Sequence, residues 1–241
     1  MNAVLAPLTA RLTGAVPFSD PEPEQVRAMP VILHIERSTP PARTALLEAA
    51  ASAAVLVCVR PEPEWQDELV AWTSSRIRKV SRRARGAHWA AVGELPGRTV
   101  RVGNAEARAL VPGLVSETPP VVGRLQISGS ELPVDKPGPV PAGVPVLWLN
   151  PGVAMTAGKA AAQVGHGSML LAAMLGSAEL SSWAGAGCPC AVRVASRPVW
   201  ESLCVPESPG EVWRRLRAVA VRDAGFTEVA PGTVTVVAQW V

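Results

Sequence analysis

The chain has 241 residues, of which 48% are hydrophobic and 18% are charged, so it is long enough to form one large domain or two small ones with a real core. Its 23 basic and 20 acidic residues leave a formal net charge of only +3, which argues against a histone-like general binder of nucleic acid. No secretory signal is visible at the start, and the most apolar stretch, residues 45–59, is too short to span a membrane and contains Glu48. We therefore expect a cytoplasmic protein.

The N-terminal part of the chain is predicted to form a tail and a small domain. Residues 1–28 are rich in proline and acid and are predicted to form a loosely ordered tail. Residues 29–132 are predicted to form a smaller N-terminal α/β domain of unknown role. Its first elements are a buried strand over 29–37, a helix from Thr39 with prolines in its first turn, and a second strand over 53–60, which together favour a parallel strand–helix–strand unit. Short strands are predicted over 88–95 and 98–104.

A long helix is predicted over residues 65–85. Its first turn carries Asp67 and Glu68 and its last turns are cationic, as the helix dipole favours. The six basic residues near its end are Arg76, Arg78, Lys79, Arg82, Arg83 and Arg85. Two interpretations stay open: a solvated helix end, or a surface that contacts phosphates, because arginine matches phosphate oxygens well.

Residues 133–144 are rich in proline and are predicted to form a semi-rigid linker, which places a domain over 145–241. That domain is predicted to be α/β, with a mixed four-stranded sheet flanked by helices. The strands are expected at 144–150, 190–195, 217–223 and 233–240. The helices are expected from Met155 with Thr156 as N-cap, over 177–187, from Arg197 to a break at Pro206 and Pro209, and over 210–216.

Four cysteines, Cys58, Cys188, Cys190 and Cys204, do not make a disulfide scaffold in a chain of this length. A Cys-x-Cys pair without a second pair is weak evidence for zinc. We interpret the cysteines as small buried apolar residues and expect no metal.

The helix after Thr156 carries an unusual set of polar residues. Its N-terminus attracts anions, and Gly158 lets a ligand approach the backbone. Lys159 lies in the first turn, where the dipole disfavours a cation, and such conflicts are typical of functional sites. Gln163 and His166 follow on the same helical face. Taken singly, each has an ordinary structural explanation, and so does Asp223, which follows a strand as a turn residue would.

Two segments in sequence, MTAGKAAAQVGHG and RDAGFTEVAPGTVTVVA, resemble the type-2 peptidyl-tRNA hydrolase family. That family has a G-K-x-A-A-Q-x-x-H helix start and a later D-A-G-x-T-x-[IV]-A-P-G-[ST] turn and strand, and the stretch CPCAVRVA between them also fits. The resemblance covers residues 145–241. It implies a domain that hydrolyses the ester between a peptide and the 3′ end of tRNA, releasing both, without metal or cofactor.

The resemblance also assigns roles to residues. The family's catalytic lysine, aspartate and threonine fall on Lys159, Asp223 and Thr227, and its substrate-binding residues fall on Gly158, Gln163 and His166. Asp223 could act as general base or orient the water, a contribution of roughly 10²–10⁴-fold. Lys159 could stabilise the oxyanion or hold the terminal phosphate, a contribution on the order of 10²–10³-fold. Thr227 could bind Asp223 or the water.

The chain departs from the family after the first strand of this domain, where residues 150–154 lack the acid and the basic residues of the family's Arg-x-Asp-Leu-Lys turn. Our hypothesis is that Arg78, Arg82 and Arg83 replace some of the lost phosphate contacts. Their replacement by alanine would then weaken tRNA binding and flatten its salt dependence. Two alternatives are a non-catalytic tRNA- or RNA-binding protein that keeps the fold, and a structural or regulatory protein. A homodimer is left open.

Overall fold

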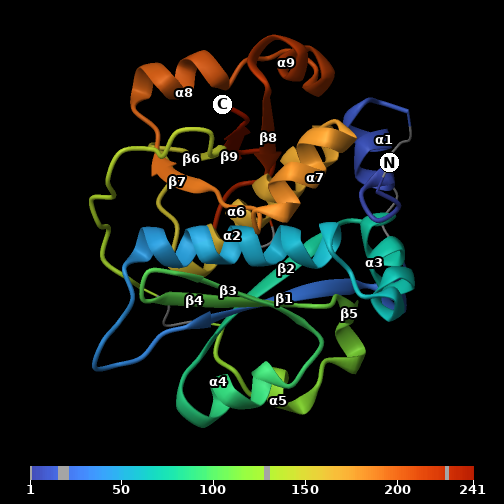
Figure 1. Cartoon of the computed structure of the whole chain (residues 1–241), viewed down its shortest axis with the longest axis vertical. Helices are drawn as coiled ribbons and strands as arrows, with labels where there is room; N and C mark the ends of the chain where they lie inside the picture. Colours follow the sequence, from blue (N-terminus) through green and yellow to red (C-terminus); the bar gives the residue numbers. More distant parts are fainter. Residues whose placement is uncertain (1, 16–21, 128–130, 226–227) are drawn as a thin grey trace.

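The computed structural model describes residues 2–15, 22–127, 131–225 and 228–241, and its chain forms two α/β units (Figure 1). The N-terminal unit is built on a mixed five-stranded sheet and the C-terminal unit on a mixed four-stranded sheet. Helices flank both sheets. The predicted fold class, a C-terminal mixed four-stranded sheet flanked by helices with an N-terminal α/β domain, is therefore confirmed.

The N-terminal sheet has the strand order β2-β1-β4-β3, and the short β5 pairs with β1. Strand β1 is parallel to β2 and antiparallel to β4, and β3 is antiparallel to β4. The strands are β1 (Arg27–His34), β2 (Arg78–Ala84), β3 (Gly97–Val102), β4 (Ala105–Leu110) and β5 (Gly113–Leu114). The helices are α2 (Arg43–Val59), α3 (Gln66–Thr73), α4 (Gly86–Gly93) and α5 (Pro120–Gly123), with the 3₁₀ turns η1 (Pro23–Gln25), η2 (Pro63–Trp65) and η3 (Val115–Glu117).

The C-terminal sheet has the strand order β7-β6-β9-β8. Strand β6 is parallel to β7 and antiparallel to β9, and β8 is antiparallel to β9. The strands are β6 (Val146–Leu149), β7 (Ala191–Val194), β8 (Ala218–Arg222) and β9 (Val234–Gln239). The helices are α6 (Ala157–Met174), α7 (Ser177–Gly185), α8 (Arg197–Leu203) and α9 (Pro209–Leu216). Each of these elements lies where the sequence predicts it.

The two units share one topology. In each, the first strand is followed by a long helix, α2 or α6, and then by a shorter one, α3 or α7. The second strand pairs with the first in parallel. The third and fourth strands form an antiparallel pair, and the fourth strand also pairs with the first, again antiparallel. The N-terminal unit therefore repeats the strand order and directions of the C-terminal unit.

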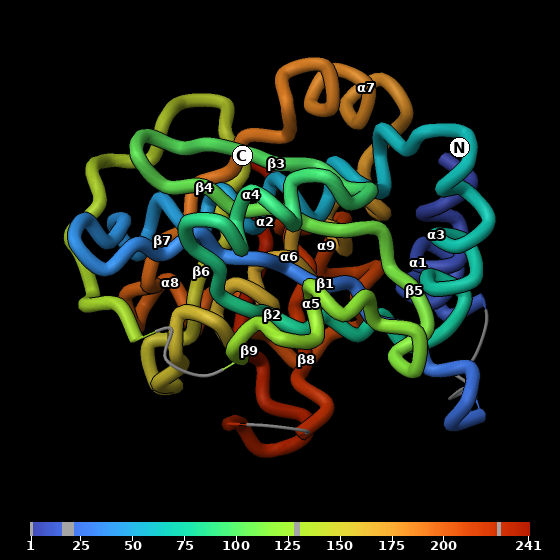
Figure 2. The backbone as a smooth tube through the Cα atoms, turned by 90° about the horizontal axis from the view of Figure 1, so that it is seen from below, coloured from blue at the N-terminus to red at the C-terminus, as the bar shows by residue number. Residues whose placement is uncertain are grey.

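Helices α2 and α6 pack against each other and fill the space between the two sheets (Figures 1 and 2). Small side chains allow the close approach: the Oγ of Ser168 on α6 donates to the backbone oxygen of Ala51 on α2 at 2.8 Å, and a Cβ at Gly165 would lie 3.2 Å from that of Ala54. Helices α4 and α5 pack against the opposite side of the N-terminal sheet, and α8 and α9 against the opposite side of the C-terminal sheet. The two units therefore share one central helical layer.

The loosely ordered tail predicted over residues 1–28 needs correction in its described part. This segment contains helix α1 (Ala6–Leu12), which packs on α6 and α3. Leu8 is buried, the Oγ1 of Thr9 donates to the backbone oxygen of Ala173 at 2.7 Å, and Nη1 of Arg11 donates to that of Ser75 at 2.6 Å. The reason is that α1 has an apolar side that the ends of α3 and α6 cover.

Three further predictions for the N-terminal unit are wrong. Residues 53–60 do not form a strand, because most of them belong to the second half of α2. The helix predicted over 65–85 ends at Thr73, and four of the basic residues that follow lie on β2, the edge strand of its sheet: Arg78, Lys79, Arg82 and Arg83. Charged side chains suit an edge strand because they keep it from pairing with other chains. Residues 88–95 lie mostly in helix α4 and not in a strand.

The predicted linker over residues 133–144 contains no helix or strand. It is nevertheless attached to both units. Asp135 accepts a hydrogen bond from the Oγ1 of Thr44 at 2.7 Å, and Arg193 donates to the backbone oxygens of Gly138 at 3.1 Å and Pro139 at 3.2 Å.

Candidate functional site

The start of helix α6 is fixed by two side-chain contacts. Thr156 is the N-cap, as predicted, and its Oγ1 accepts a hydrogen bond from the backbone nitrogen of Lys159 at 3.1 Å. Glu228, from the connection between β8 and β9, accepts from the backbone nitrogen of Thr156 at 3.0 Å and from its Oγ1 at 2.8 Å. The helix start and the β8–β9 connection are therefore tied together, and Lys159 stands in the first turn.

Asp223 follows β8 directly and is buried. Its Oδ1 accepts a hydrogen bond from the backbone nitrogen of Gly225 at 2.8 Å, and its backbone pairs with Thr233 and Gly232 at 2.9 and 2.8 Å. Gly225 has a φ of +81°, and a Cβ there would lie 2.7 Å from the ring of Pro231, so glycine is required. The turn therefore holds the carboxylate in a fixed orientation.

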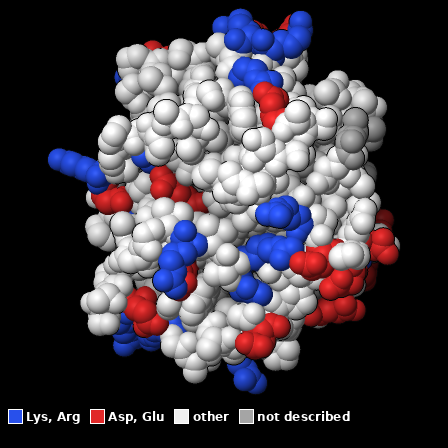
Figure 3. All heavy atoms as spheres, viewed as in Figure 1, with Lys and Arg blue, Asp and Glu red and all other residues white. Residues whose placement is uncertain are grey.

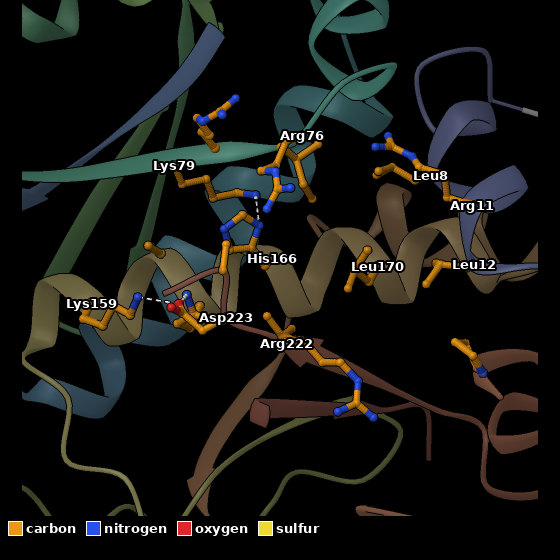
Figure 4. A pocket seen from close by; sticks show the side chains of 17 residues that line it. Leu8, Arg11, Leu12, Arg76, Lys79, Lys159, His166, Leu170, Arg222 and Asp223 are labelled. Atoms are coloured by element: carbon orange, nitrogen blue, oxygen red, sulfur yellow. Dashed lines mark hydrogen bonds and ion pairs between the residues drawn. The ribbon is translucent and has the colours of Figure 1, made fainter. Parts of the chain in front are cut away.

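Lys159 and Asp223 form a buried ion pair across α6 and the end of β8 (Figure 4). Their side chains are only 10% and 5% exposed. The same carboxylate oxygen, Oδ2, accepts a hydrogen bond from Nε2 of Gln163 at 2.9 Å. The Oγ1 of Thr235 on β9 donates to the Oε1 of Gln163, which turns the amide nitrogen of Gln163 toward Asp223. Lys159, Gln163 and Asp223 thus form one connected cluster.

Sequence reasoning missed Thr235. It is a fully buried threonine among the valines of β9. A hydroxyl at the centre of an apolar strand must find a partner inside the protein, because an unpaired buried hydroxyl costs free energy. That interruption of the apolar pattern was the available signal.

His166 contacts a lysine from the other unit. Nζ of Lys79, on β2, lies 3.1 Å from Nδ1 of His166, and the two side chains point toward each other in Figure 4. Burial, with the charges of Lys79 and Lys159 nearby, lowers the pKa of His166 well below its ordinary value. Burial also lowers the pKa of Lys79 to about 7, with Cys58 acting weakly in the opposite direction. When Lys79 carries its charge, its ammonium can only donate, so Nδ1 of His166 is then the acceptor of this hydrogen bond.

A cavity of about 480 Å³ opens at this cluster and is lined from both units. The C-terminal unit contributes Lys159, Gln163, His166, Arg222 and Asp223, among others. The N-terminal unit contributes Arg76, Ile77, Arg78 and Lys79 from β2 and the segment before it, and α1 contributes Leu8, Arg11 and Leu12 (Figure 4). The site therefore lies at the junction of the two units and not within the C-terminal unit alone.

The structure brings together part of the residue set singled out in the sequence. Arg78 lines the cavity, and Gly158 lies buried at the start of α6. Arg82 and Arg83 do not line the cavity: Arg82 donates to the backbone oxygen of Leu125 at 2.8 Å, and Arg83 to the side chain of Gln126. Because β2 is extended, Arg82 and Arg83 lie further along the strand than Arg78 and away from the cavity. Thr227 lies outside the described residues.

The altered turn over residues 150–154 is built around Asn150. Its Nδ2 donates to the backbone oxygen of Val234 at 2.7 Å, and its Oδ1 accepts from the backbone nitrogen of Gly152 at 2.8 Å. The turn thus ties the end of β6 to the start of β9. In this chain Asn150 closes a loop and supplies no charge to the site.

The described residues also bear on the expectations about cysteines, metals and membranes. Cys58, Cys188 and Cys190 are buried, as predicted, and burial raises the pKa of each thiol to about 12, whereas Cys204 is only half-buried. Within the described ranges, no group of three or more His, Cys, Asp or Glu side chains is placed to hold a metal ion. Within the same ranges, no single helix is long and apolar enough to cross a membrane, although the bent pair Arg43–Val59 and Pro63–Thr73 has the required length and composition together.

Comparison with known proteins gives one match. A family model described as Peptidyl-tRNA hydrolase PTH2 matches residues 144–239, which include β6, α6, β8 and β9 and every residue of the Lys159–Gln163–Asp223 cluster. No curated protein and no solved structure matches the chain. The match covers less than half of the chain and leaves the N-terminal unit outside it. Residues 144–239, the C-terminal part of this chain, are therefore similar to the peptidyl-tRNA hydrolase PTH2 family.

Proposed function

We propose that the protein hydrolyses the ester bond of peptidyl-tRNA and releases free tRNA and peptide. The observation that carries this proposal is the buried Lys159–Asp223 pair at the N-terminus of α6, in a domain that is similar to the PTH2 family. A buried ion pair contributes little to stability, because desolvating both charges offsets their attraction. A functional role therefore explains the Lys159–Asp223 pair better than a contribution to stability does. A cation in the first turn of a helix, against the helix dipole, supports the same conclusion.

In this proposal, Asp223 holds the attacking water. Its Oδ2 already accepts from Lys159 and Gln163, and its Oδ1 accepts from Gly225. Among the described residues, Oδ1 therefore keeps one acceptor position, since a carboxylate oxygen takes two hydrogen bonds. A water that donates there is oriented for attack on the ester carbonyl carbon, and its proton passes to the carboxylate.

Lys159 and the helix N-terminus would then stabilise the negative charge that forms on the carbonyl oxygen. When the tetrahedral intermediate collapses, the bond to the 3′ oxygen of the tRNA breaks and that oxygen leaves with a proton. The products are a free carboxylic acid and a free 3′ hydroxyl. Thr227 stays a predicted partner of Asp223 or of the water.

The charge around the site suits a nucleic-acid substrate. On the face shown in Figure 3, basic groups are interspersed with acidic ones, as a net charge of +3 implies. The cavity differs: of the described residues that line it, six are basic and only Asp223 is acidic, and that acid is already paired. Positive charge concentrated in a cavity attracts the phosphates of an RNA 3′ end.

The test is release of labelled peptide from an N-acetylated aminoacyl-tRNA by the full chain and its variants. We expect Asp223→Asn and Lys159→Ala each to reduce the rate on the order of 10²–10³-fold, because each removes a group that acts in the transition state. Lys136→Ala, at an exposed lysine outside the cluster, is the control and should match the wild type. No release by the wild type would favour the non-catalytic tRNA-binding alternative. Equal release by all variants would refute the site.

A folding control is needed, because removing one partner of a buried pair leaves the other charge unpaired, at a cost of about 3–5 kcal/mol. The isosteric double variant Lys159→Met with Asp223→Asn removes both charges. We expect it to recover most of the stability in urea unfolding while staying inactive. Activity in the double variant would contradict the roles assigned here.

A further inference from the structure

We propose that Lys79, supplied by the N-terminal unit, is a substrate-binding residue of this site and takes a phosphodiester at the 3′ end of the RNA. The inference rests on the proposed function but concerns a residue outside the segment that matches the family. Four observations carry it. The N-terminal unit lacks the cluster found in the C-terminal unit, and Lys79 reaches the other unit's site. None of the described partners of Lys79 carries a negative charge, and the cavity around it is cationic.

The N-terminal unit repeats the topology of the hydrolase domain without its chemistry. In the C-terminal unit, Lys159, Gln163 and His166 stand three, seven and ten residues after the N-cap of α6. The positions at the same intervals after the N-cap of α2 are Ala45, Ala49 and Ser52. The turn between β3 and β4 has only two residues, Gly103 and Asn104, and no acid. The equivalents of this cluster are therefore missing from this unit.

Lys79 crosses from the N-terminal sheet to the hydrolase site. Its aliphatic stem passes over Gly165 of α6, where an added Cβ would lie 3.2 Å from its Cδ and 3.3 Å from its Cε. Its ammonium ends 3.1 Å from Nδ1 of His166 and 5.0 Å from the centre of the Trp72 ring. A lysine held in this way stands at a fixed place on the cavity wall.

The surroundings of Lys79 favour an anion as its ligand. Among the described residues, no carboxylate forms an ion pair with Lys79, and its two contacts, His166 and Trp72, are both without negative charge. Arg76 and Arg78 line the cavity beside it, and Asp223 is already bound to Lys159. Burying a cation is costly without an opposite charge, so a bound phosphate would supply what the folded protein lacks.

Binding of a phosphate should also change the protonation of Lys79. The pKa of this lysine is lowered to about 7, so near pH 7.5 many molecules carry it as the neutral amine. The titratable groups that face Lys79 are His166 from α6 and Cys58 from α2, and Lys159 lies across the cavity. Arg76 and Arg78, which precede Lys79 in the sequence, also line the cavity. A phosphate held at its Nζ favours the ammonium, and binding takes up a proton.

The first test compares Lys79→Met with the wild type in peptide release from peptidyl-tRNA. We expect KM to rise about 10- to 100-fold, which is the loss of one charge-assisted hydrogen bond, with kcat changed far less. Lys136→Met is the matched control, an exposed lysine changed in the same way, and should leave KM unchanged. An unchanged KM in Lys79→Met, with normal release by the wild type, would overturn the inference and leave the proposed function standing.

The second test measures proton uptake by calorimetry in two buffers of different ionisation enthalpy at pH 7.5. The ligand is a short single-stranded RNA with a peptide joined to its 3′ end through an amide, which cannot be released as an ester. We expect the wild type to take up a fraction of a proton on binding and Lys79→Met to take up none. This arm does not depend on turnover, so it decides the role of Lys79 even if peptidyl-tRNA is not hydrolysed. Binding by the wild type without proton uptake would overturn the inference.

Discussion

At the level of single residues, Lys79 is expected to reduce the stability of the fold. Its pKa falls from 10.5 in the unfolded chain to about 7 in the folded protein, because burial disfavours the ammonium. Between these two values the unfolded chain binds more protons than the folded one, so wild-type stability rises with pH through this window. Below about pH 7 both states are protonated and the whole penalty is present.

We therefore expect Lys79→Met to be more stable than the wild type at pH 6 and 7, with an advantage that fades as pH rises toward 10. Urea unfolding at pH 6, 8 and 10 would measure this, with Lys136→Met as the variant that should show no such trend. A purely structural lysine would give the opposite sign, since its removal would destabilise the protein at every pH. A variant that is more stable but binds RNA more weakly is typical of a functional residue that reduces stability.

The sequence predicts some residues of the site and not others. Lys159, Gln163 and Asp223 were found because they stand in long motifs with fixed spacing, and the structure brings them together. Thr235 contacts Gln163 of this cluster and shows in the sequence only as a polar interruption of an apolar strand, and Lys79 contacts the neighbouring His166 without any local pattern. Lys79 looked like one of several basic residues on a helix, and only the pairing of β1 with β2 brings it to α6.

At the level of elements, the C-terminal strands and helices were predictable because turn and cap signals mark each of them. Thr156, Ser196 and Ser208 cap α6, α8 and α9 with their side chains. The second half of α2 was not, because this helix is buried on almost every side and its apolar residues show no helical period. A run such as residues 53–60 then fits a buried strand equally well.

Strand β2 gives a prediction of its own. Arg78 begins β2 and lines the cavity, whereas Arg82, four residues further along the same face of the strand, donates to a backbone oxygen near α5. We expect Arg78→Ala to lower the slope of log binding constant against log salt by about 0.7, the value for one phosphate on a single strand. Arg82→Ala should leave the slope unchanged. Binding of the amide-linked RNA at several salt concentrations measures both, and equal changes in the two variants would contradict the assignment of Arg78 to the site.

At the level of the whole molecule, the two units repeat one topology, which no sequence pattern predicted. The equivalent helix positions hold Lys159 in one unit and Ala45 in the other, so the repeat is visible only in the strand order. Length and composition allow one large domain or two small ones and say little about the contact between two domains. The packing of α2 on α6 had no sequence signal apart from the small residues that both helices carry.

This shared layer makes the C-terminal unit dependent on the N-terminal one. Glu48 of α2 forms an ion pair with Arg193 at 2.8 Å and accepts from the backbone nitrogen of Val192 at 3.1 Å on the edge strand β7. The two side chains of the pair are only 16% and 14% exposed. Separation would remove the partner of Arg193 and would expose the apolar side of α6 that α2 covers.

We therefore expect residues 133–241, produced alone, to lack a cooperative unfolding transition and to release no peptide. Adding residues 1–132 as a separate chain should restore both, because the interface between the units is apolar and closely packed. Adding the same fragment with Lys79→Met should restore the unfolding transition, since the α2–α6 contact is intact, but leave KM raised. Circular dichroism and peptide release on the three mixtures separate these outcomes. A C-terminal fragment that unfolds cooperatively and matches the kcat/KM of the full chain would contradict both the dependence on α2 and the role of Lys79.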